Sequence, residues 1–156
     1  MKSTQNVNQI VTHAEILCKS HGARLTTKRK LILSSLIQSG KALSAYDLID
    51  LCKDNFNENI PAMSVYRILE FLESEKLVHK LKLANKYVAC SHITCDHDHG
   101  VPQFLICGTC DHVKEISINK STISQLKNDV EQAGFQLLNS QLEMNCICNN
   151  CQDNSA

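Results

Sequence analysis

The sequence has no tryptophan, only two prolines and five glycines, and aromatic side chains make up 4% of its 156 residues. It also lacks any apolar stretch that approaches the length of a membrane-spanning helix. No signal peptide is evident, because residues 1–9 are polar. These absences predict a cytoplasmic protein whose thiols stay reduced. The chain is 43% hydrophobic and 21% charged, which is typical of a folded protein with one ordinary domain or two small ones.

The chain has no net charge, because 16 Lys and Arg residues balance 16 Asp and Glu residues. A neutral total argues against a nucleic-acid partner, but the two halves of the chain differ. Residues 1–86 carry a net charge of +5, and residues 87–156 carry a net charge of −5. This asymmetry indicates a polyanion-binding module in the basic half.

The first half is predicted to be helical. A first apolar stripe is followed by a second helix, with Thr26 as its cap and Gly40 at its end. Ser44 begins an approximate capping box ahead of a third helix, and Pro61 precedes a fourth. Two strand-like runs then follow, at 78–81 and 87–90. Helices followed by a β-hairpin predict a winged helix-turn-helix.

The second half alternates strand-like and helix-like segments. A helix that begins near a capping Ser121 is predicted to end at Gly134 with one apolar stripe facing inward. The predicted strands of this half span 103–106, 113–118 and 135–143. This small α/β unit has few apolar residues, so we expect a metal ion or a partner subunit to stabilise it.

Two C-x2-C pairs lie in the second half, with 37 residues between them. They comprise Cys107, Cys110, Cys148 and Cys151. Each pair places two thiolates on one side of a tight turn, in which Gly108 supplies backbone freedom. Two such pairs complete the tetrahedral four-sulfur shell that structural zinc prefers. Cys146 could replace one ligand, although Cys148 and Cys151 have the better spacing.

A second group of donor residues surrounds the junction of the two halves. It comprises His79, Cys90, His92, Cys95, His97, His99 and Glu115. A mixed nitrogen, sulfur and oxygen site suits zinc better than calcium or magnesium. The alternative is a solvated polar loop without metal. By contrast, Cys18 and Cys52 lie among apolar residues and are predicted to be small core residues.

A DNA-contacting surface is predicted on the basic half. In a winged helix, the second helix of the helix-turn-helix enters the major groove, and here that helix covers residues 64–76. Its exposed N-terminal positions are Ser64, Tyr66 and Arg67, of which Arg67 has the donor fork that reads a guanine edge. A further cluster lies at the start of the second helix and comprises Arg24, Thr26, Lys28, Arg29 and Lys30. A solvated face of an ordinary helical domain is the alternative.

Several motifs in this order resemble the ferric uptake regulator family, and most of all its zinc uptake regulator branch. The matching segments are Arg24-Leu25-Thr26, Ser44-Ala45-Tyr46-Asp47-Leu48, Val65-Tyr66-Arg67, Tyr87-Val88-Ala89-Cys90 and Phe104-Leu105-Ile106-Cys107-Gly108-Thr109-Cys110. The resemblance covers nearly the whole chain, from about residue 8 to Cys151. It implies a homodimeric, non-enzymatic transcriptional repressor with an α+β fold, in which Tyr46 joins the DNA-binding residues. The domains would be a winged helix at 1–86, a metal-binding α/β dimerisation domain at 87–151 and a tail at 152–156.

The same resemblance implies two zinc ions per subunit. The structural ion would take the four cysteines of the C-x2-C pairs. The regulatory ion would take His79, Cys90, His99 and Glu115, with His97 as the alternative to His99. The loop before the Phe104 strand is two residues longer than the family pattern and contains an extra thiol, Cys95. Zinc bound at the regulatory site would favour operator binding and repress zinc uptake genes.

Three alternatives remain open from the sequence. An iron- or peroxide-sensing regulator of the same family would keep the fold, and Cys90 argues against it because ferrous sensing favours nitrogen and oxygen ligands. A zinc hydrolase would need the motif H-E-x-x-H, and a zinc deaminase would need H-x-E paired with P-C-x-x-C. The sequence contains neither H-E-x-x-H nor this pair. A zinc-storage or delivery protein would leave the basic half unexplained.

Overall fold

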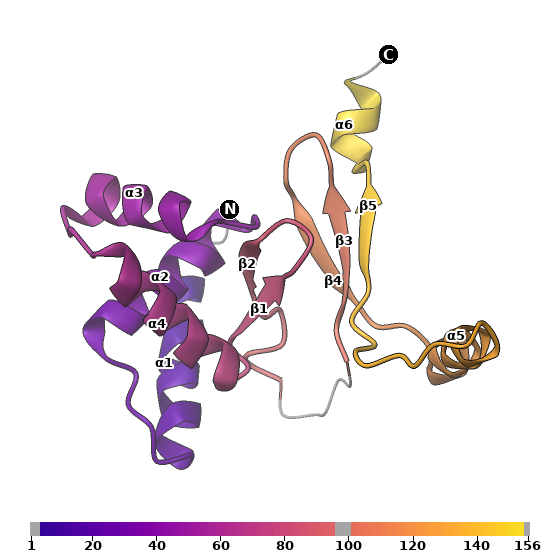
Figure 1. Ribbon diagram of the computed structural model, residues 1–156. Helices are drawn as coiled ribbons and strands as arrows, with labels where there is room; N and C mark the ends of the chain where they lie inside the picture. Colours follow the sequence, from indigo (N-terminus) through magenta and orange to yellow (C-terminus); the bar gives the residue numbers. More distant parts are fainter. Residues whose placement is uncertain (1–3, 96–100, 155–156) are drawn as a thin grey trace. The chain divides into compact units, whose positions relative to one another are not determined.

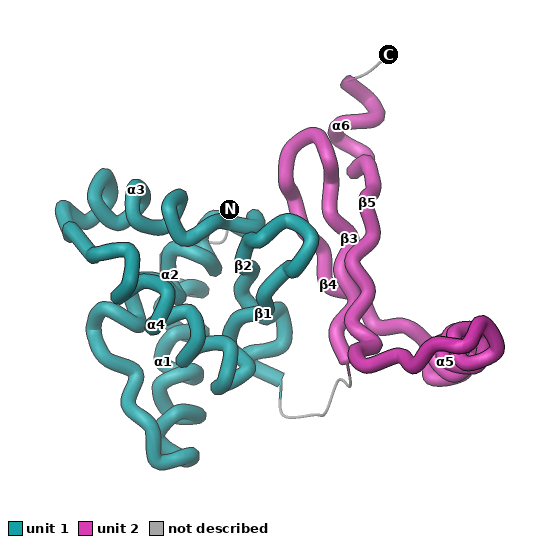
Figure 2. The backbone as a smooth tube through the Cα atoms, viewed as in Figure 1, with its two compact units in different colours: residues 1–96 teal, residues 97–156 magenta. Residues whose placement is uncertain are grey.

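The computed structural model describes residues 4–95 and 101–154 and combines helices with two small sheets (Figure 1). The chain divides into unit 1, residues 1–96, and unit 2, residues 97–156 (Figure 2). The α+β class is as predicted from the sequence. The division lies ten residues after the predicted boundary at 86, because the second strand of the hairpin pairs with the first and so belongs to unit 1.

Unit 1 begins with four helices. They are α1 (Thr4–Ser20), α2 (Thr27–Ser39), α3 (Ala45–Phe56) and α4 (Ala62–Ser74). The predicted caps are present: the side chain of Thr26 accepts a hydrogen bond from the backbone N–H of Arg29, and Gly40 ends α2 in the left-handed conformation with φ 61°. Helices α3 and α4 follow each other in the chain and pack together, which is the arrangement of the helix-turn-helix that the sequence predicts.

The core of unit 1 lies between these helices. Its fully buried side chains include Ile32, Leu33, Leu48, Leu69 and Leu72. Cys18 and Cys52 are completely buried in the same cluster, which confirms that they are core residues. Burial raises the pKa of both thiols, so both stay protonated at neutral pH and are poor metal ligands.

A short hairpin follows α4. Strand β1 (Val78–Leu81) pairs antiparallel with β2 (Lys86–Ala89), and His79 lies opposite Val88. Leu43, in the segment between α2 and α3, exchanges two backbone hydrogen bonds with Tyr87, at 2.8 and 2.9 Å. The hairpin is thereby tied to the helices, as a wing is in a winged helix.

Unit 2 contains a three-stranded sheet in the order β4-β3-β5. Its elements are β3 (Gln103–Cys107), β4 (Val113–Ile116), α5 (Lys120–Gln132), β5 (Glu143–Cys146) and α6 (Asn149–Asp153). Strand β3 pairs antiparallel with β4 and parallel with β5. The chain therefore crosses over through α5 between the two edge strands. The described part of the chain includes no helix that is long and apolar enough to span a membrane.

Two sequence predictions in unit 2 were wrong. The strand predicted at 135–143 forms only at its last residue, and β5 covers Glu143–Cys146 instead. Asn119, not Ser121, caps α5, because the Asn119 side chain accepts the backbone N–H of Ser121. Helix α5 has no fully buried residue and stands away from the three strands in Figure 1. The apolar side chains of α5 are therefore only partly buried within one chain.

The capping box of α3 gives a first test. The backbone N–H of Asp47 donates to the Ser44 hydroxyl at 3.1 Å, and the backbone N–H of Ser44 donates to the Asp47 carboxylate at 2.8 Å. We expect Ser44→Ala to lower the free energy of unfolding by about 1 kcal/mol in urea denaturation. The Ser44 N–H also lowers the pKa of Asp47 from 3.8. The stabilisation by its carboxylate is present above that value and is lost as the pH falls through the folded-state pKa.

Asp47→Asn should therefore destabilise the chain at pH 7 and have a smaller effect near pH 3. Asp50→Asn, on the same helix and exposed, is the matched control and should have little effect at either pH. Equal losses for the two variants would contradict the capping role.

Candidate metal centre and nucleic-acid interface

Four sulfur atoms converge at one end of the sheet in unit 2. The Sγ atoms of Cys107, Cys110, Cys148 and Cys151 all lie within 4.8 Å of one another. The sulfurs of Cys110 and Cys148 are 3.7 Å apart. In a tetrahedral zinc site with bonds of about 2.3 Å, two sulfurs are separated by about 3.8 Å. The donor set and its spacing therefore fit a four-thiolate zinc ion.

The parallel pairing of β3 with β5 explains how cysteines so far apart in the sequence meet. Cys107 is the register partner of Cys146, and the backbone N–H of Gly108 donates to the Cys146 carbonyl at 2.9 Å. The chain that continues past Cys146 therefore reaches the first C-x2-C turn, where Cys148 caps α6 and Cys151 lies within it. Cys146 itself lies outside the group of four ligand atoms.

Gly108 has a different role from the predicted one. The left-handed backbone of this turn falls on Asp111, with φ 59°, and not on the glycine. A side chain at position 108 would instead meet the Asn145 side chain, since an added Cβ would lie 3.0 Å from its Oδ1. The glycine therefore permits the close approach of β5 to the turn.

The pKa values of two thiols in this cluster are shifted in opposite directions. The backbone N–H groups of Cys148, Cys110 and Thr109 donate to the Cys107 sulfur and lower the pKa of its thiol to about 6. Hydrogen bonds with the side chains of Cys148 and Cys110 raise the pKa of the Cys151 thiol to about 12. These opposite shifts favour the thiolate at Cys107 and the protonated thiol at Cys151. Binding of a metal cation by all four sulfurs would displace that proton.

A second pair of donors lies on the wing of unit 1. His79 belongs to β1, and Cys90 directly follows β2, with its backbone N–H bonded to the Leu77 carbonyl at 2.9 Å. The ligand atoms of His79 and Cys90 lie within 4.8 Å of each other. The backbone N–H of His92 donates to the Cys90 sulfur at 3.4 Å. The pair therefore offers one nitrogen and one sulfur to a soft cation.

Of the other predicted ligands of this second site, Glu115 lies among the described residues and the two histidines do not. Glu115 lies on β4 of unit 2, opposite Phe104 in the sheet, and is half-buried. His97 and His99 lie outside the described residues. Cys95 is exposed, and its backbone N–H bonds to the His92 carbonyl at 3.0 Å.

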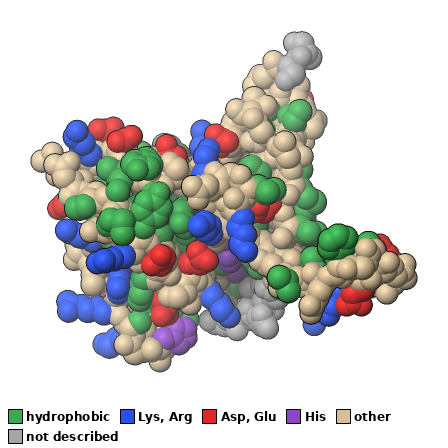
Figure 3. All heavy atoms as spheres, viewed as in Figure 1, with side chains coloured by type: hydrophobic (Ala, Val, Ile, Leu, Met, Phe, Trp, Pro, Cys, Tyr) green, Lys and Arg blue, Asp and Glu red, His purple; other side chains and the backbone are tan. Residues whose placement is uncertain are grey.

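The predicted DNA-contacting residues divide by exposure. Arg24, Thr26, Lys28, Tyr46 and Arg67 are exposed, and the Tyr46 side chain is 65% exposed at the start of α3. Figure 3 shows hydrophobic side chains gathered over the helices of unit 1, with Lys and Arg side chains around them. Arg, Lys and Tyr side chains are among the groups that contact DNA phosphates, and this surface offers all three.

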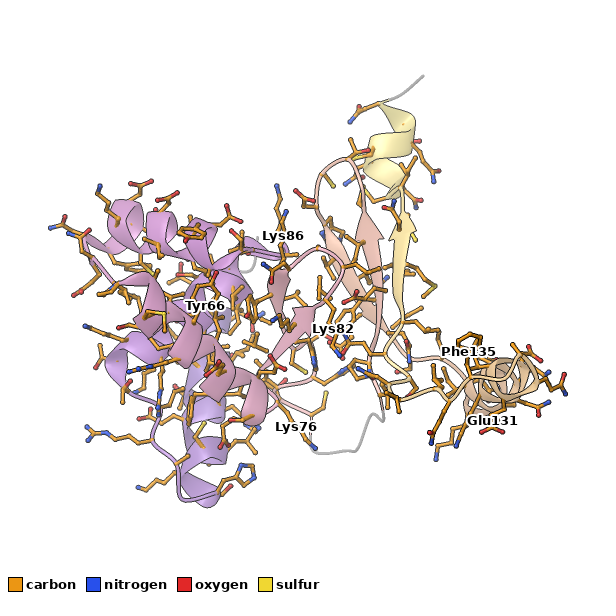
Figure 4. The ribbon with its side chains drawn as sticks, viewed as in Figure 1. Tyr66, Lys76, Lys82, Lys86, Glu131 and Phe135 are labelled. Atoms are coloured by element: carbon orange, nitrogen blue, oxygen red, sulfur yellow. The ribbon has the colours of Figure 1, made fainter. Side chains whose placement is uncertain are left out.

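Four predicted DNA-contacting residues are partly engaged within the fold. Ser64 and Lys30 are half-buried, and the Lys30 Nζ lies 2.8 Å from a Glu15 carboxylate oxygen. Tyr66, labelled on α4 in Figure 4, is half-buried and packs against the core. The guanidinium of Arg29 lies 3.5 Å from the centre of the Phe71 ring, and its Nη1 donates to the Arg24 carbonyl at 2.6 Å. Arg29 therefore holds α2 and the preceding loop against α4, and we expect it to position the interface without touching a phosphate.

The salt dependence of DNA binding distinguishes a phosphate-contacting role of Lys28 from a positioning role of Arg29. Each neutralised phosphate contributes about 0.9 to the slope of log affinity against log salt. Lys28→Ala should reduce this slope by about one, whereas Arg29→Ala should weaken binding by a similar factor at every salt concentration and lower the melting temperature. The measurement is fluorescence anisotropy at salt concentrations between about 50 and 200 mM. An equal loss of slope for both variants would show that Arg29 contacts a phosphate.

Sequence reasoning missed one exposed residue of this surface. Met63 is 65% exposed at the second position of α4. It lies four residues before Arg67 and outside the buried stripe of Val65, Ile68 and Leu69. That spacing was visible in the sequence and would have placed Met63 beside Arg67.

Together, the units define a winged-helix protein with a four-cysteine metal centre. The chain belongs to the ferric uptake regulator family, whose sequence model matches residues 20–145. Members of this family are transcription regulators. The chain is 32% identical over 143 residues to the zinc uptake regulation protein of Escherichia coli (strain K12), and the match covers 92% of this chain and 81% of the relative.

Solved structures agree with this assignment. A zinc uptake regulator complexed with zinc and DNA matches with a TM-score of 0.81 and 28% identity, over 99% of each chain. The crystal structure of holo XcZur matches with a TM-score of 0.74 and 33% identity, over 94% of this chain and 99% of that one. Both share the α+β architecture described above.

Proposed function

We propose that this chain is a cytoplasmic, zinc-responsive repressor that binds operator DNA as a homodimer and controls zinc uptake genes. The observation that carries the proposal is the convergence of His79 and Cys90 on the wing of the DNA-binding unit. A metal ion held there would lie on the wing, which belongs to the same unit as the helix-turn-helix. The similarity to zinc uptake regulators, one of them complexed with zinc and DNA, supports the choice of signal.

Two zinc ions per subunit are part of the proposal. The first is structural and is held by the thiolates of Cys107, Cys110, Cys148 and Cys151, which tie the end of the chain to the β3–β4 turn. A closed shell of four protein ligands leaves no position for a substrate, so this ion has a structural role, and we propose no enzymatic activity.

The second zinc ion is regulatory. His79 and Cys90 would supply nitrogen and sulfur, Glu115 would supply a carboxylate oxygen, and His99 would be the fourth ligand, with His97 as the alternative. This donor set rests on the family resemblance and on the chemistry of the residues. A thiolate among the ligands favours zinc over the nitrogen and oxygen site expected of a ferrous sensor.

The mechanism follows from the origin of these ligands. His79 and Cys90 belong to the wing, whereas Glu115 belongs to a strand of unit 2. A zinc ion would be held by donors that come from both units. With both sets of residues held by one ion, unit 1 would sample fewer orientations, and a larger fraction of dimers would present two recognition helices at the spacing of a palindromic operator.

The exposed apolar residues of unit 2 support the homodimer. Phe135 is 73% exposed, Leu138 is 91% exposed and Ile147 is 54% exposed. Figure 4 labels Phe135 close to α5, whose side chains are not fully buried either. Covering these side chains with a second copy would remove apolar surface from water, and a homodimer would do so symmetrically.

A gel-shift titration at fixed salt tests the function. Duplexes selected from a random-sequence pool by the zinc-loaded chain are titrated with protein under buffered free zinc. We expect specific binding to near-palindromic sequences that is lost when a chelator empties the regulatory site. Tight specific binding that persists after this removal would overturn the zinc response, and an absence of any specific binding would point to zinc storage.

The metal selectivity of Cys90→Ser separates zinc from iron sensing. The wild-type chain should respond to zinc and not to ferrous iron. The variant should lose zinc affinity and shift toward metals that accept oxygen ligands. A wild-type chain that responds to ferrous iron alone would favour the iron-sensing alternative.

A further inference from the structure

The recognition helix exposes a methionine at its leading end. Met63 is the second residue of α4, and its side chain is 65% exposed. The opposite face of this helix is buried through Val65, Ile68 and Leu69. Packing within unit 1 therefore does not account for an apolar side chain at this position.

Met63 and Arg67 form one row on the exposed face of α4. Residues four apart lie side by side on a helix, and side chains lean toward the N-terminus. Met63 therefore lies ahead of Arg67, at a distance of about 6 Å along the helix axis. Base pairs rise by about 3.4 Å, so the two side chains span one or two neighbouring base pairs.

The charges along α4 indicate which end of the helix approaches DNA. Arg67 is exposed near the N-terminal end, whereas the exposed residues Glu70 and Glu73 follow it toward the C-terminal end. Phosphates repel these carboxylates and are attracted to the positive end of the helix dipole. The end that carries Met63 is thus the one that enters the groove.

From these observations we infer that Met63 contacts the 5-methyl group of a thymine in the major groove, one or two base pairs from the guanine read by Arg67. The inference rests on the proposed function and extends it to a specificity-determining residue. Thymine is the base that presents an apolar group in the major groove. A flexible, polarizable thioether chain adapts its shape to such a methyl group, and the charged neighbour Arg67 favours a polyanion over an apolar protein surface.

A methyl-deletion cycle tests the contact. The full-length, zinc-loaded wild-type chain first selects its operator from a random-sequence pool. Each thymine of that duplex is then replaced by deoxyuridine, which removes only the methyl group. We expect one thymine per half-site at which wild-type affinity falls about fourfold. With Met63→Ala, the same replacement should change affinity by less than about 1.5-fold, because the methyl contact worth about one methylene is already absent.

The control variants separate this contact from general damage. Met63→Leu should retain most of the deoxyuridine effect, and Ile16→Ala, which removes an apolar side chain that is 61% exposed on α1, should retain all of it. The salt slope of Met63→Ala should equal that of the wild type, because no charge is removed.

Failure of the thymine contact can be distinguished from failure of the proposed function. If the wild type selects an operator but deoxyuridine has equal effects on wild type and Met63→Ala at every position, the thymine contact is refuted. If Met63→Ala fails to fold, an unchanged deoxyuridine effect at every thymine in Met63→Gln also refutes it, because a polar amide cannot replace the apolar contact. If the wild type selects no operator, the proposed function itself fails.

Discussion

Replacing Cys148 with serine is expected to remove the structural zinc and to unfold unit 2. The Cys148 sulfur lies 3.7 Å from that of Cys110, and the group of four fits a tetrahedral ion. Structural zinc sites contribute about 10–16 kcal/mol of apparent binding free energy, which becomes folding free energy. Unit 2 has little buried apolar material of its own, so it has little with which to offset the loss.

Three measurements check this result. Metal analysis should show one zinc fewer per chain, analytical ultracentrifugation should show monomers, and circular dichroism should retain the helices of unit 1. Cys146→Ser is the matched control, because Cys146 lies two residues away but outside the sulfur group. A Cys148→Ser chain that keeps its full zinc content and its dimer would contradict the assignment, as would an equal loss in the Cys146 variant.

Replacing His79 with alanine is expected to abolish the zinc response while leaving the fold intact. His79 is a half-buried donor on the wing that does not belong to the core cluster, whereas Cys90 is half-buried and packs against that cluster. Coupling between an effector site and a second ligand is worth about 5- to 150-fold in affinity. We therefore expect operator binding in saturating zinc to fall by a factor in this range, to the value of the wild-type chain with an empty regulatory site.

Operator titrations with and without zinc provide the test for His79→Ala. Zinc content should fall by one ion per chain, and the thermal transition of unit 1 should change little. His112→Ala is the control, since the exposed His112 side chain belongs to neither donor group. The variant keeps the His112 backbone carbonyl, which accepts the Cys107 N–H at 2.9 Å. A His79→Ala chain that still requires zinc for operator binding would exclude His79 as a regulatory ligand.

Local elements of the fold could be predicted because their causes lie within a few residues. Thr26 caps α2, Gly40 ends it in the left-handed conformation, and Ser44 with Asp47 closes a capping box. Each of these devices satisfies backbone groups at a helix end through neighbours in the sequence. For the same reason, β1 was predicted with its observed bounds.

Elements that depend on distant partners were predicted less well. Strand β5 pairs in parallel with β3, about forty residues earlier in the chain, and no local pattern marks where that pairing begins. The apolar residues around Phe135 suggested a strand, although Phe135 is 73% exposed on a single chain. Asn119 replaced Ser121 as the cap of α5 because both residue types are good caps and only the backbone conformation decides between them.

By itself, the sequence determined the chemistry of this protein. The spacing of Cys107, Cys110, Cys148 and Cys151 and the division of charge at residue 86 follow from residue identity alone. Only the tertiary structure decided which thiols meet and which side chains remain available. The register of β3 with β5 leaves Cys146 outside the sulfur group, and the Phe71 ring engages Arg29. These outcomes depend on contacts between residues far apart in the chain, which spacing within one segment does not encode.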